Sequence, residues 1–294
     1  FLTVVLLLVG IALVLLSADK LTDGATGLAR RFNVTEMVIG LTVVAFGTSL
    51  PELVTSFMSA LKGSSEISIG NIVGSNTFNV LIVGCSALVS PIVISKSTIH
   101  KDIPFAILAT LSLIVVSLDA VLDGGQFENL ISRTDGLMLL GLFAVFMFYT
   151  FSIARNKDGA GEQPQALQIA PMSYGRIFLY VILGLAGLVF GGNLFVDAAT
   201  EIALSMGVSE TVVGLTLVAA GTSLPELATS IVAARKGSSA IAIGNVVGSN
   251  IFNIFFVMGF CATVSPMPVG SISYFDLGLM LLSILILWCF SYTK

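Results

Sequence analysis

One segment of 41 residues occurs twice in this chain of 294 residues. Residues 40–80 align without a gap to residues 214–254, and 29 of the 41 aligned pairs are identical. Shared hydrophobicity alone does not produce that degree of identity, so the chain is a duplicated unit. We expect a first copy over residues 1–154 and a second copy over residues 174–294, joined by residues 155–173.

The sequence around the repeat is too apolar for a water-soluble domain. Hydrophobic residues make up 56% of the chain and charged residues only 10%, whereas a polar surface requires far more charge. Several apolar runs reach the roughly 20 residues that cross a hydrocarbon core, and they recur along the whole chain. The sequence therefore predicts an all-α polytopic membrane protein that has the lipid bilayer as its solvent.

Apolar runs and their polar breaks predict five helices in the first copy and four in the second. The expected helices span residues 1–31, 35–61, 67–90, 103–122 and 135–154, then 174–205, 209–235, 242–264 and 273–292. By the offset between the copies, the counterpart of the fifth helix would begin near residue 309. We therefore expect ten helices in all, the last of them absent from this sequence.

An odd number of helices per copy inserts the second copy upside down, and the basic residues test this independently. Loops rich in Lys and Arg are usually cytoplasmic. One side holds only Lys62 and Arg133, whereas the loops after odd-numbered helices hold Arg30, Arg31, Lys96, Lys101, Arg155, Lys157, Arg176, Arg235, Lys236 and Lys294. We expect the N-terminus outside, a flexible cytoplasmic linker between the copies, and a location in a prokaryotic cytoplasmic membrane.

The motif GTSLPE lies in the middle of an apolar helix in each copy and ends at Glu52 or Glu226. A carboxylate at bilayer depth costs roughly 2.5 kcal/mol or more, and no lysine or arginine stands nearby as a partner. The proline before each glutamate removes a backbone N–H and frees the carbonyl four residues earlier. Broken helices of this kind coordinate cations in transporters.

A second motif is GNIVGSNTFN at residues 70–79, repeated as GNVVGSNIFN at residues 244–253. Side chains that carry oxygen recur at every fourth position and form one stripe on each helix. The stripes consist of Asn71, Ser75 and Asn79 in the first copy and Asn245, Ser249 and Asn253 in the second. We expect the four helices that carry the two motifs to converge on one polar centre.

The donors at this centre are carboxylate, hydroxyl, amide and backbone carbonyl oxygens. Such ligands, without thiolate or imidazole, suit hard cations. Calcium takes six to eight oxygens, and two glutamates neutralise its charge; sodium can use a subset of the same ligands. Because two bare carboxylates are unfavourable in lipid, an empty site is disfavoured, which enforces exchange over leak.

Both copies of both motifs resemble the α-repeats of the sodium/calcium exchanger branch of the calcium/cation antiporter superfamily. The resemblance implies an antiporter that exchanges Na⁺ for Ca²⁺ by alternating access, with the first and sixth helices sliding against the core that carries the ligands. Some prokaryotic relatives carry Asp where this chain has Asn253. The resemblance also assigns Asn71 and Asn245 to holding the helices.

The resemblance implies a set of ligands, position by position. Carboxylates come from Glu52 and Glu226, backbone carbonyls from Thr48 and Thr222, hydroxyls mainly for sodium from Ser49, Ser223, Ser75 and Ser249, and amides from Asn79 and Asn253.

The sequence also leaves alternative functions to compare with Na⁺/Ca²⁺ exchange. The alternatives within the superfamily are an H⁺/Ca²⁺ exchanger and a K⁺-dependent Na⁺/Ca²⁺ exchanger. An intramembrane protease would need catalytic groups at depth, whereas Asp119, Asp123 and the single histidine, His100, belong to loops. A channel would show a ring of charges or carbonyls from repeated subunits. We expect no enzyme activity, no cofactor, no nucleic acid and no obligate protein partner.

Overall fold

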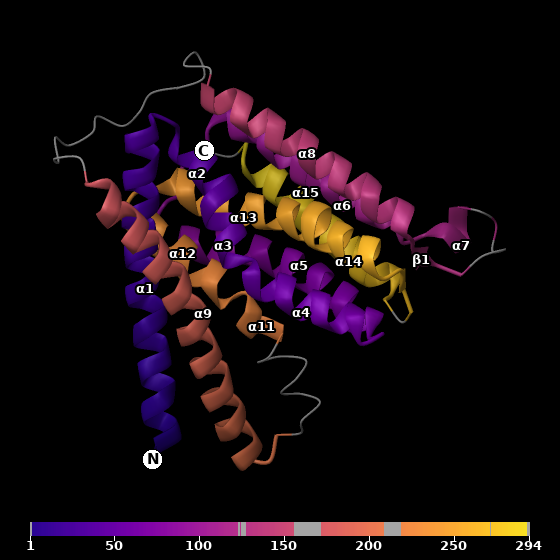
Figure 1. The fold of residues 1–294 in the computed structure, drawn as a ribbon, viewed down its shortest axis with the longest axis horizontal. Coiled ribbons are helices and arrows are strands. Elements are labelled where there is room, and N and C mark those ends of the chain that lie inside the picture. Colours follow the sequence, from indigo (N-terminus) through magenta and orange to yellow (C-terminus); the bar gives the residue numbers. More distant parts are fainter. Residues whose placement is uncertain are drawn as a thin grey trace.

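The computed structural model describes residues 2–122, 124, 128–155, 172–208, 219–270 and 272–292, and these are almost entirely helical (Figure 1). The elements of the first copy are α1 (Leu2–Phe32), α2 (Glu36–Ile39), the π-helical turn η1 (Gly40–Val44), α3 (Ala45–Thr48), α4 (Leu50–Leu61), α5 (Ser65–Val89), the π-helical turn η2 (Thr98–Asp102), α6 (Ile103–Val116), α7 (Asp119–Leu122) and α8 (Arg133–Arg155).

The described part of the second copy has a similar order, but a π-helical turn interrupts the helix that corresponds to α5. Its elements are α9 (Tyr174–Ser205), α11 (Ala219–Thr222), α12 (Leu224–Arg235), α13 (Ser239–Ile251), the π-helical turn η5 (Phe252–Met258), α14 (Gly259–Val264) and α15 (Tyr274–Phe290). Most of the predicted linker, at residues 156–171, and the first part of the predicted helix 209–235 lie outside the described residues.

Six helices in the described part of the chain are long and apolar enough to cross a membrane, and a broken pair raises the number to seven. The broken pair joins residues 36–48 to α4 with a bend of 47°. The bend falls where Ser49 leaves the helical conformation (ψ 9°) and Pro51 opens the new helix, because proline has no N–H to continue the preceding one. The predicted break is therefore confirmed.

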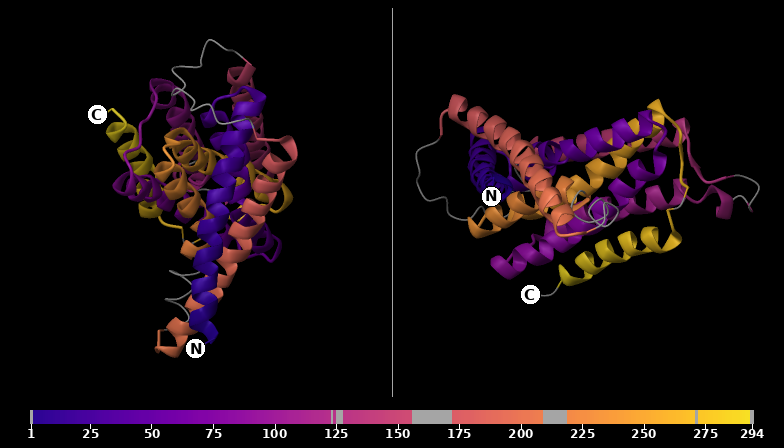
Figure 2. Two further views of the ribbon diagram at one scale, coloured as in Figure 1. Left: turned by 90° about the vertical axis from the view of Figure 1, so that its left-hand side faces the viewer. Right: turned by 90° about the horizontal axis from the view of Figure 1, so that it is seen from below.

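The first helix of each copy, α1 and α9, forms an antiparallel pair. Glycines allow close contact: Gly184 lies against the backbone of Leu21, and Gly191 lies against Val14. The residue numbers of these pairs have a constant sum, as antiparallel packing requires. Figure 2 (left) shows the two helices side by side and extending beyond the other helices. Equivalent helices thus run in opposite directions, as the predicted inversion demands.

The helices differ in how much of their apolar surface other helices cover. The most apolar part of the span 239–264, which contains α13, is 94% buried, whereas that of α8 is only 17% buried. Small residues permit the close packing of the buried span. Gly244 of α13 lies against Gly40, and a Cβ added at Gly244 would lie only 3.0 Å from the Gly40 Cα. The span 239–264 is therefore central, and α8 lies at the periphery with an apolar outer face suited to lipid.

The predicted helix 103–122 is wrong at its end, because α6 stops at Val116 and a separate turn, α7, follows. The Ser117 N–H closes the last turn on the carbonyls of Leu113 and Ile114. Asp119 then accepts a hydrogen bond from the Leu130 N–H at 3.3 Å. These polar bonds draw the chain away from the helix axis toward a two-residue strand, β1 (Leu130–Ile131), which pairs antiparallel with β2 (Met267–Pro268).

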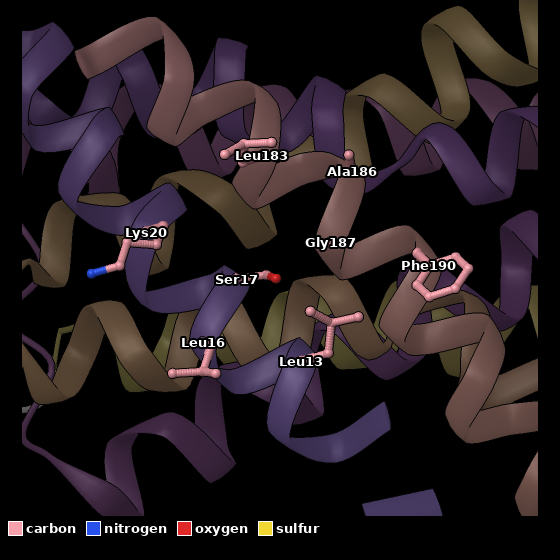
Figure 3. A pocket seen from close by; sticks show the side chains of 8 residues that line it. All are labelled: Leu13, Leu16, Ser17, Lys20, Leu183, Ala186, Gly187 and Phe190. Atoms are coloured by element: carbon pink, nitrogen blue, oxygen red, sulfur yellow. The ribbon is translucent and has the colours of Figure 1, made fainter. Parts of the chain in front are cut away.

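A shallow apolar groove of about 430 Å³ lies between α1 and α9 (Figure 3). Leu13 and Leu16 line it from α1, and Leu183 and Phe190 line it from α9. None of the predicted ligands contributes to this groove, so it is separate from the polar centre described below.

Candidate ion-binding site

The two glutamates of the GTSLPE motifs begin the second halves of the broken helices. Glu52 lies in the first turn of α4, and Glu226 lies in the first turn of α12. Both side chains are fully buried, at 0% exposure. Helix N-termini favour negative charge, because their first N–H groups have no partner within the helix. In both copies the N-terminus of a helix therefore stabilises the buried carboxylate.

Serines of one copy donate hydrogen bonds to the glutamate of the other copy. Ser49 Oγ lies 3.1 Å from Glu226 Oε1, and Ser223 Oγ lies 3.2 Å from Glu52 Oε1. Ser75 joins the same group, because its hydroxyl lies 3.4 Å from Glu52 Oε1 and 3.3 Å from Ser223 Oγ. The site therefore lies between the copies, and each copy supplies half of it.

Two threonines complete the arrangement around the carboxylates. Thr48 lies beside the Glu226 carboxyl, and Thr222 lies beside that of Glu52. The Thr48 hydroxyl also donates to Asn245 Oδ1 at 3.0 Å. The carboxyl groups of Glu52 and Glu226 are themselves close enough to interact electrostatically. The predicted convergence of the motifs on one polar centre is borne out by this geometry.

Several buried oxygens of the predicted ligands have no hydrogen-bond partner among the described residues. A buried acceptor without a partner costs free energy, so it is available to a water, another donor or a cation. The unpartnered atoms of the predicted ligands are Glu52 Oε2, Glu226 Oε2, Ser249 Oγ, Asn79 Oδ1 and Asn253 Oδ1.

Asn71 and Asn245 hold the broken helices rather than facing the carboxylates. Asn71 Nδ2 donates to Ser56 Oγ at 3.0 Å and lies 3.4 Å from the Glu52 carbonyl. Asn245 Nδ2 makes the equivalent bonds in the second copy, to Ser230 Oγ at 3.1 Å and to the Glu226 carbonyl at 3.3 Å. These bonds tie each stripe helix to the helix that carries the glutamate.

Sequence reasoning missed Asn76 and Asn250. Each directly follows a stripe serine and therefore points about 100° away from the stripe, which is why helical periodicity did not select it. In the structure both are buried and form bonds across the boundary between the copies, Asn76 with Asn253 and Asn250 with Asn79. The signal that could have found them is the duplication itself, because the Ser-Asn pair is identical in both copies.

Charges near the site do not neutralise the glutamates. Ion pairs among the described residues involve only Lys20 and Lys236, both paired with acidic residues of α1. The same part of the chain contains no group of three or more His, Cys, Asp or Glu side chains placed to hold a metal. Any cation at this centre must therefore use two carboxylates together with neutral oxygens.

Comparison with known proteins identifies the family. The sequence model described as "Sodium/calcium exchanger protein" matches residues 2–152 and 176–294. The chain belongs to the sodium/calcium exchanger family. Sodium/calcium exchanger MaX1 of Methanosarcina acetivorans is 33% identical over 299 residues, covering 92% of this chain and 85% of its own length. The inner membrane protein YrbG of Escherichia coli K12 is 37% identical over 284 residues, 94% of this chain and 85% of YrbG.

Solved structures of the exchanger NCX_Mj have the same fold. With the NCX_Mj structure soaked with 2.5 mM Na⁺ and 0.1 mM Ca²⁺, the TM-score is 0.83 at 33% sequence identity, over 100% of this chain and 92% of that one. The chain is therefore an integral membrane protein of a transporter family, a cation/Ca²⁺ antiporter and not an enzyme. The predicted fold class and family resemblance are both confirmed.

Proposed function

We propose that this exchanger-family chain couples Na⁺ to Ca²⁺ by alternating access, with the ions competing for ligands from both copies. The observation that carries the proposal is the pair of fully buried glutamates, each with one carboxylate oxygen that no described residue satisfies. A divalent cation between them supplies the missing counter-charge. The ligands are Glu52, Glu226, Thr48, Thr222, Ser49, Ser223, Ser75, Ser249, Asn79 and Asn253.

Competition between the ions follows from the charge of the site. Two carboxylates carry two negative charges, which one Ca²⁺ or two Na⁺ neutralise, while the hydroxyl and amide oxygens replace the hydration shell. An empty site leaves two like charges in a medium of low dielectric constant, which is costly. The protein with an ion bound is therefore favoured to change between its outward-facing and inward-facing states, and one ion leaves only as the other replaces it.

Alternating access is supported by the contact between α9 and the broken helices. A Cβ added at Gly47 would collide with Leu185 of α9, and one added at Gly221 would collide with Val196 of α9. Both glycines belong to the GTSLPE motifs, so apolar side chains of α9 lie directly over the two breaks. A slide of the α1–α9 pair would move these side chains and change which side of the site is covered.

The orientation in the membrane rests on the distribution of basic residues. We propose that the N-terminus of α1 faces outward. The loops after the first, third, fifth, seventh and ninth of the expected membrane helices, which carry most of the Lys and Arg residues, face the cytoplasm of a prokaryotic cell. Under this orientation the two copies, 1–154 and 174–294, are joined by a cytoplasmic linker at 155–173.

Flux in proteoliposomes tests the proposal. Calcium uptake should require an outward Na⁺ gradient and should vanish in Glu52→Gln and in Glu226→Gln, because each variant removes one of the two charges that balance Ca²⁺. Glu128→Gln is the matched control, since Glu128 is an exposed loop residue, and it should retain uptake. Uptake that persists in both site variants contradicts the assignment.

The same assay separates the alternatives within the superfamily. Uptake driven by a pH gradient without sodium identifies an H⁺/Ca²⁺ exchanger. Uptake that needs sodium and also potassium identifies a K⁺-dependent exchanger. Sodium-driven uptake that is indifferent to both supports the proposal as stated.

A further inference from the structure

Four buried asparagines form a closed set of hydrogen bonds where the two copies meet, which we call the amide clasp. Asn76 Nδ2 lies 3.4 Å from the Asn250 carbonyl, and Asn250 Nδ2 lies 3.3 Å from the Asn76 carbonyl. Asn79 Nδ2 donates to Asn250 Oδ1 at 2.9 Å. Asn253 Nδ2 donates to Asn76 Oδ1 at 3.2 Å. The clasp has two-fold symmetry and connects α5 with α13 and η5.

The direction of every bond in the clasp follows from the backbone. A peptide carbonyl can only accept, so the side-chain atom of Asn250 that faces the Asn76 carbonyl must be the NH₂ group. Its Oδ1 then faces Asn79, which must present its own NH₂ group to that acceptor. The remaining atom of Asn79, its Oδ1, is left pointing away from the clasp.

The same reasoning applies to the other half. The Asn250 carbonyl requires the NH₂ group of Asn76, so Asn76 Oδ1 accepts from Asn253 and leaves Asn253 Oδ1 free. Asn79 Oδ1 and Asn253 Oδ1 are in fact buried without a partner among the described residues. These are the amide oxygens of the proposed site.

We infer that Asn76 and Asn250 are positioning residues that set which atom the ligand amides present to the cation. This inference rests on the proposed function and adds two residues to it that touch no ion themselves. Each works across the boundary: Asn76 of the first copy orients Asn253 of the second, and Asn250 orients Asn79.

Orientation matters because an amide has two chemically opposite ends. A carbonyl oxygen is a good ligand for a hard cation, whereas the NH₂ group carries partial positive charge and repels one. The shape of the two ends is nearly the same, so packing alone does not choose between them. Without the clasp, a fraction of the molecules would present NH₂ groups to the ion, and the apparent affinity for the ion would fall by that fraction.

The experiment compares Asn76→Ala in two backgrounds, the parent chain and Asn253→Asp. A carboxylate at position 253 presents an oxygen whichever way it turns and has no hydrogen to donate to Asn76 Oδ1, so Asn76 does not orient it. In the parent, Asn76→Ala should raise the KM for Ca²⁺ uptake by at least about twofold, the effect when the freed amide of Asn253 presents its two ends equally, with kcat little changed. In the Asn253→Asp background, the same substitution should not raise KM.

Asn250→Ala in the parent and in Asn79→Asp is the mirror experiment, and it answers the question if Asn76→Ala does not fold. A residue that only packs helices would lower kcat and the yield of folded protein by the same factor in both backgrounds. An equal rise of KM in both backgrounds, for either pair, therefore overturns the clasp. Absence of sodium-driven uptake in the parent chain is a different result, because it overturns the proposed function itself.

Discussion

Ser49 donates its hydroxyl hydrogen to Glu226 Oε1 at 3.1 Å, although 177 residues separate them. The inverse pair, Ser223 and Glu52, makes the same bond at 3.2 Å. Each glutamate thus depends on a serine from the other copy, so neither copy contains a complete site. Duplication followed by inversion is what makes the site, because only antiparallel copies bring the two helix breaks face to face.

The two-fold relation predicts similar effects at symmetric positions. Ser49→Ala and Ser223→Ala each remove one hydroxyl from a glutamate, and each should raise the KM for Ca²⁺ about tenfold. Ser86→Ala is the control, because Ser86 is also fully buried but lies about three helical turns beyond Ser75 on α5. Initial rates of calcium uptake measure the effect. A raised KM in one of the two site variants and an unchanged KM in the other would contradict a shared site.

Under the proposed function calcium binds the native site and not the unfolded chain, so it should stabilise the folded protein. At about 100 times its Kd, a ligand adds about 2.7 kcal/mol to the free energy of unfolding. The melting temperature in detergent should rise with Ca²⁺, return to its starting value with a chelator, and remain constant in Glu52→Gln. A rise of equal size in Glu52→Gln would place the calcium elsewhere.

Close packing at Gly248 should make that position intolerant of a side chain. A Cβ there would lie 2.7 Å from the Leu41 carbonyl oxygen and 2.7 Å from the Ala45 Cβ. Gly248→Ala should therefore lower the free energy of unfolding by about 1–3 kcal/mol. Gly141→Ala in α8 is the control, since nothing lies within 4 Å of its would-be Cβ and alanine favours helix. Equal stability of the two variants would contradict the close contact of α13 with the broken helix.

Lys236 ties α12 to α1, with Nζ at 2.7 Å from Asp19 and 2.6 Å from Asp23. These groups are partly exposed, so the pairs contribute less than about 1 kcal/mol and are screened by salt. Lys236→Met should therefore lower the melting temperature slightly at low salt and hardly at high salt. Lys62→Met tests the equivalent position, whose lysine is exposed and has no ion pair among the described residues, and it should have no effect. A shift that is independent of salt would assign the loss to packing instead.

Much of the fold could be predicted because its rules are local. The length of an apolar run determines a membrane helix, and a proline in the middle determines a break, as at Pro51. The end of the helix expected over residues 103–122 could not be predicted in this way. Its apolar residues continue past Val116, but the hydrogen bond that Asp119 accepts from the Leu130 N–H of β1 decides where the chain turns.

By itself the sequence singled out the ligands of the proposed site, since the duplicated glutamates, serines and asparagines are visible in the motifs. Only the tertiary structure decided which of them meet. Helical periodicity relates residues a few positions apart, whereas the bonds of Ser49 to Glu226 and of Asn76 to Asn253 join helices from opposite copies. The end that an amide presents to the proposed ion site depends in addition on what its other end contacts, and that contact exists only when the two copies are packed together.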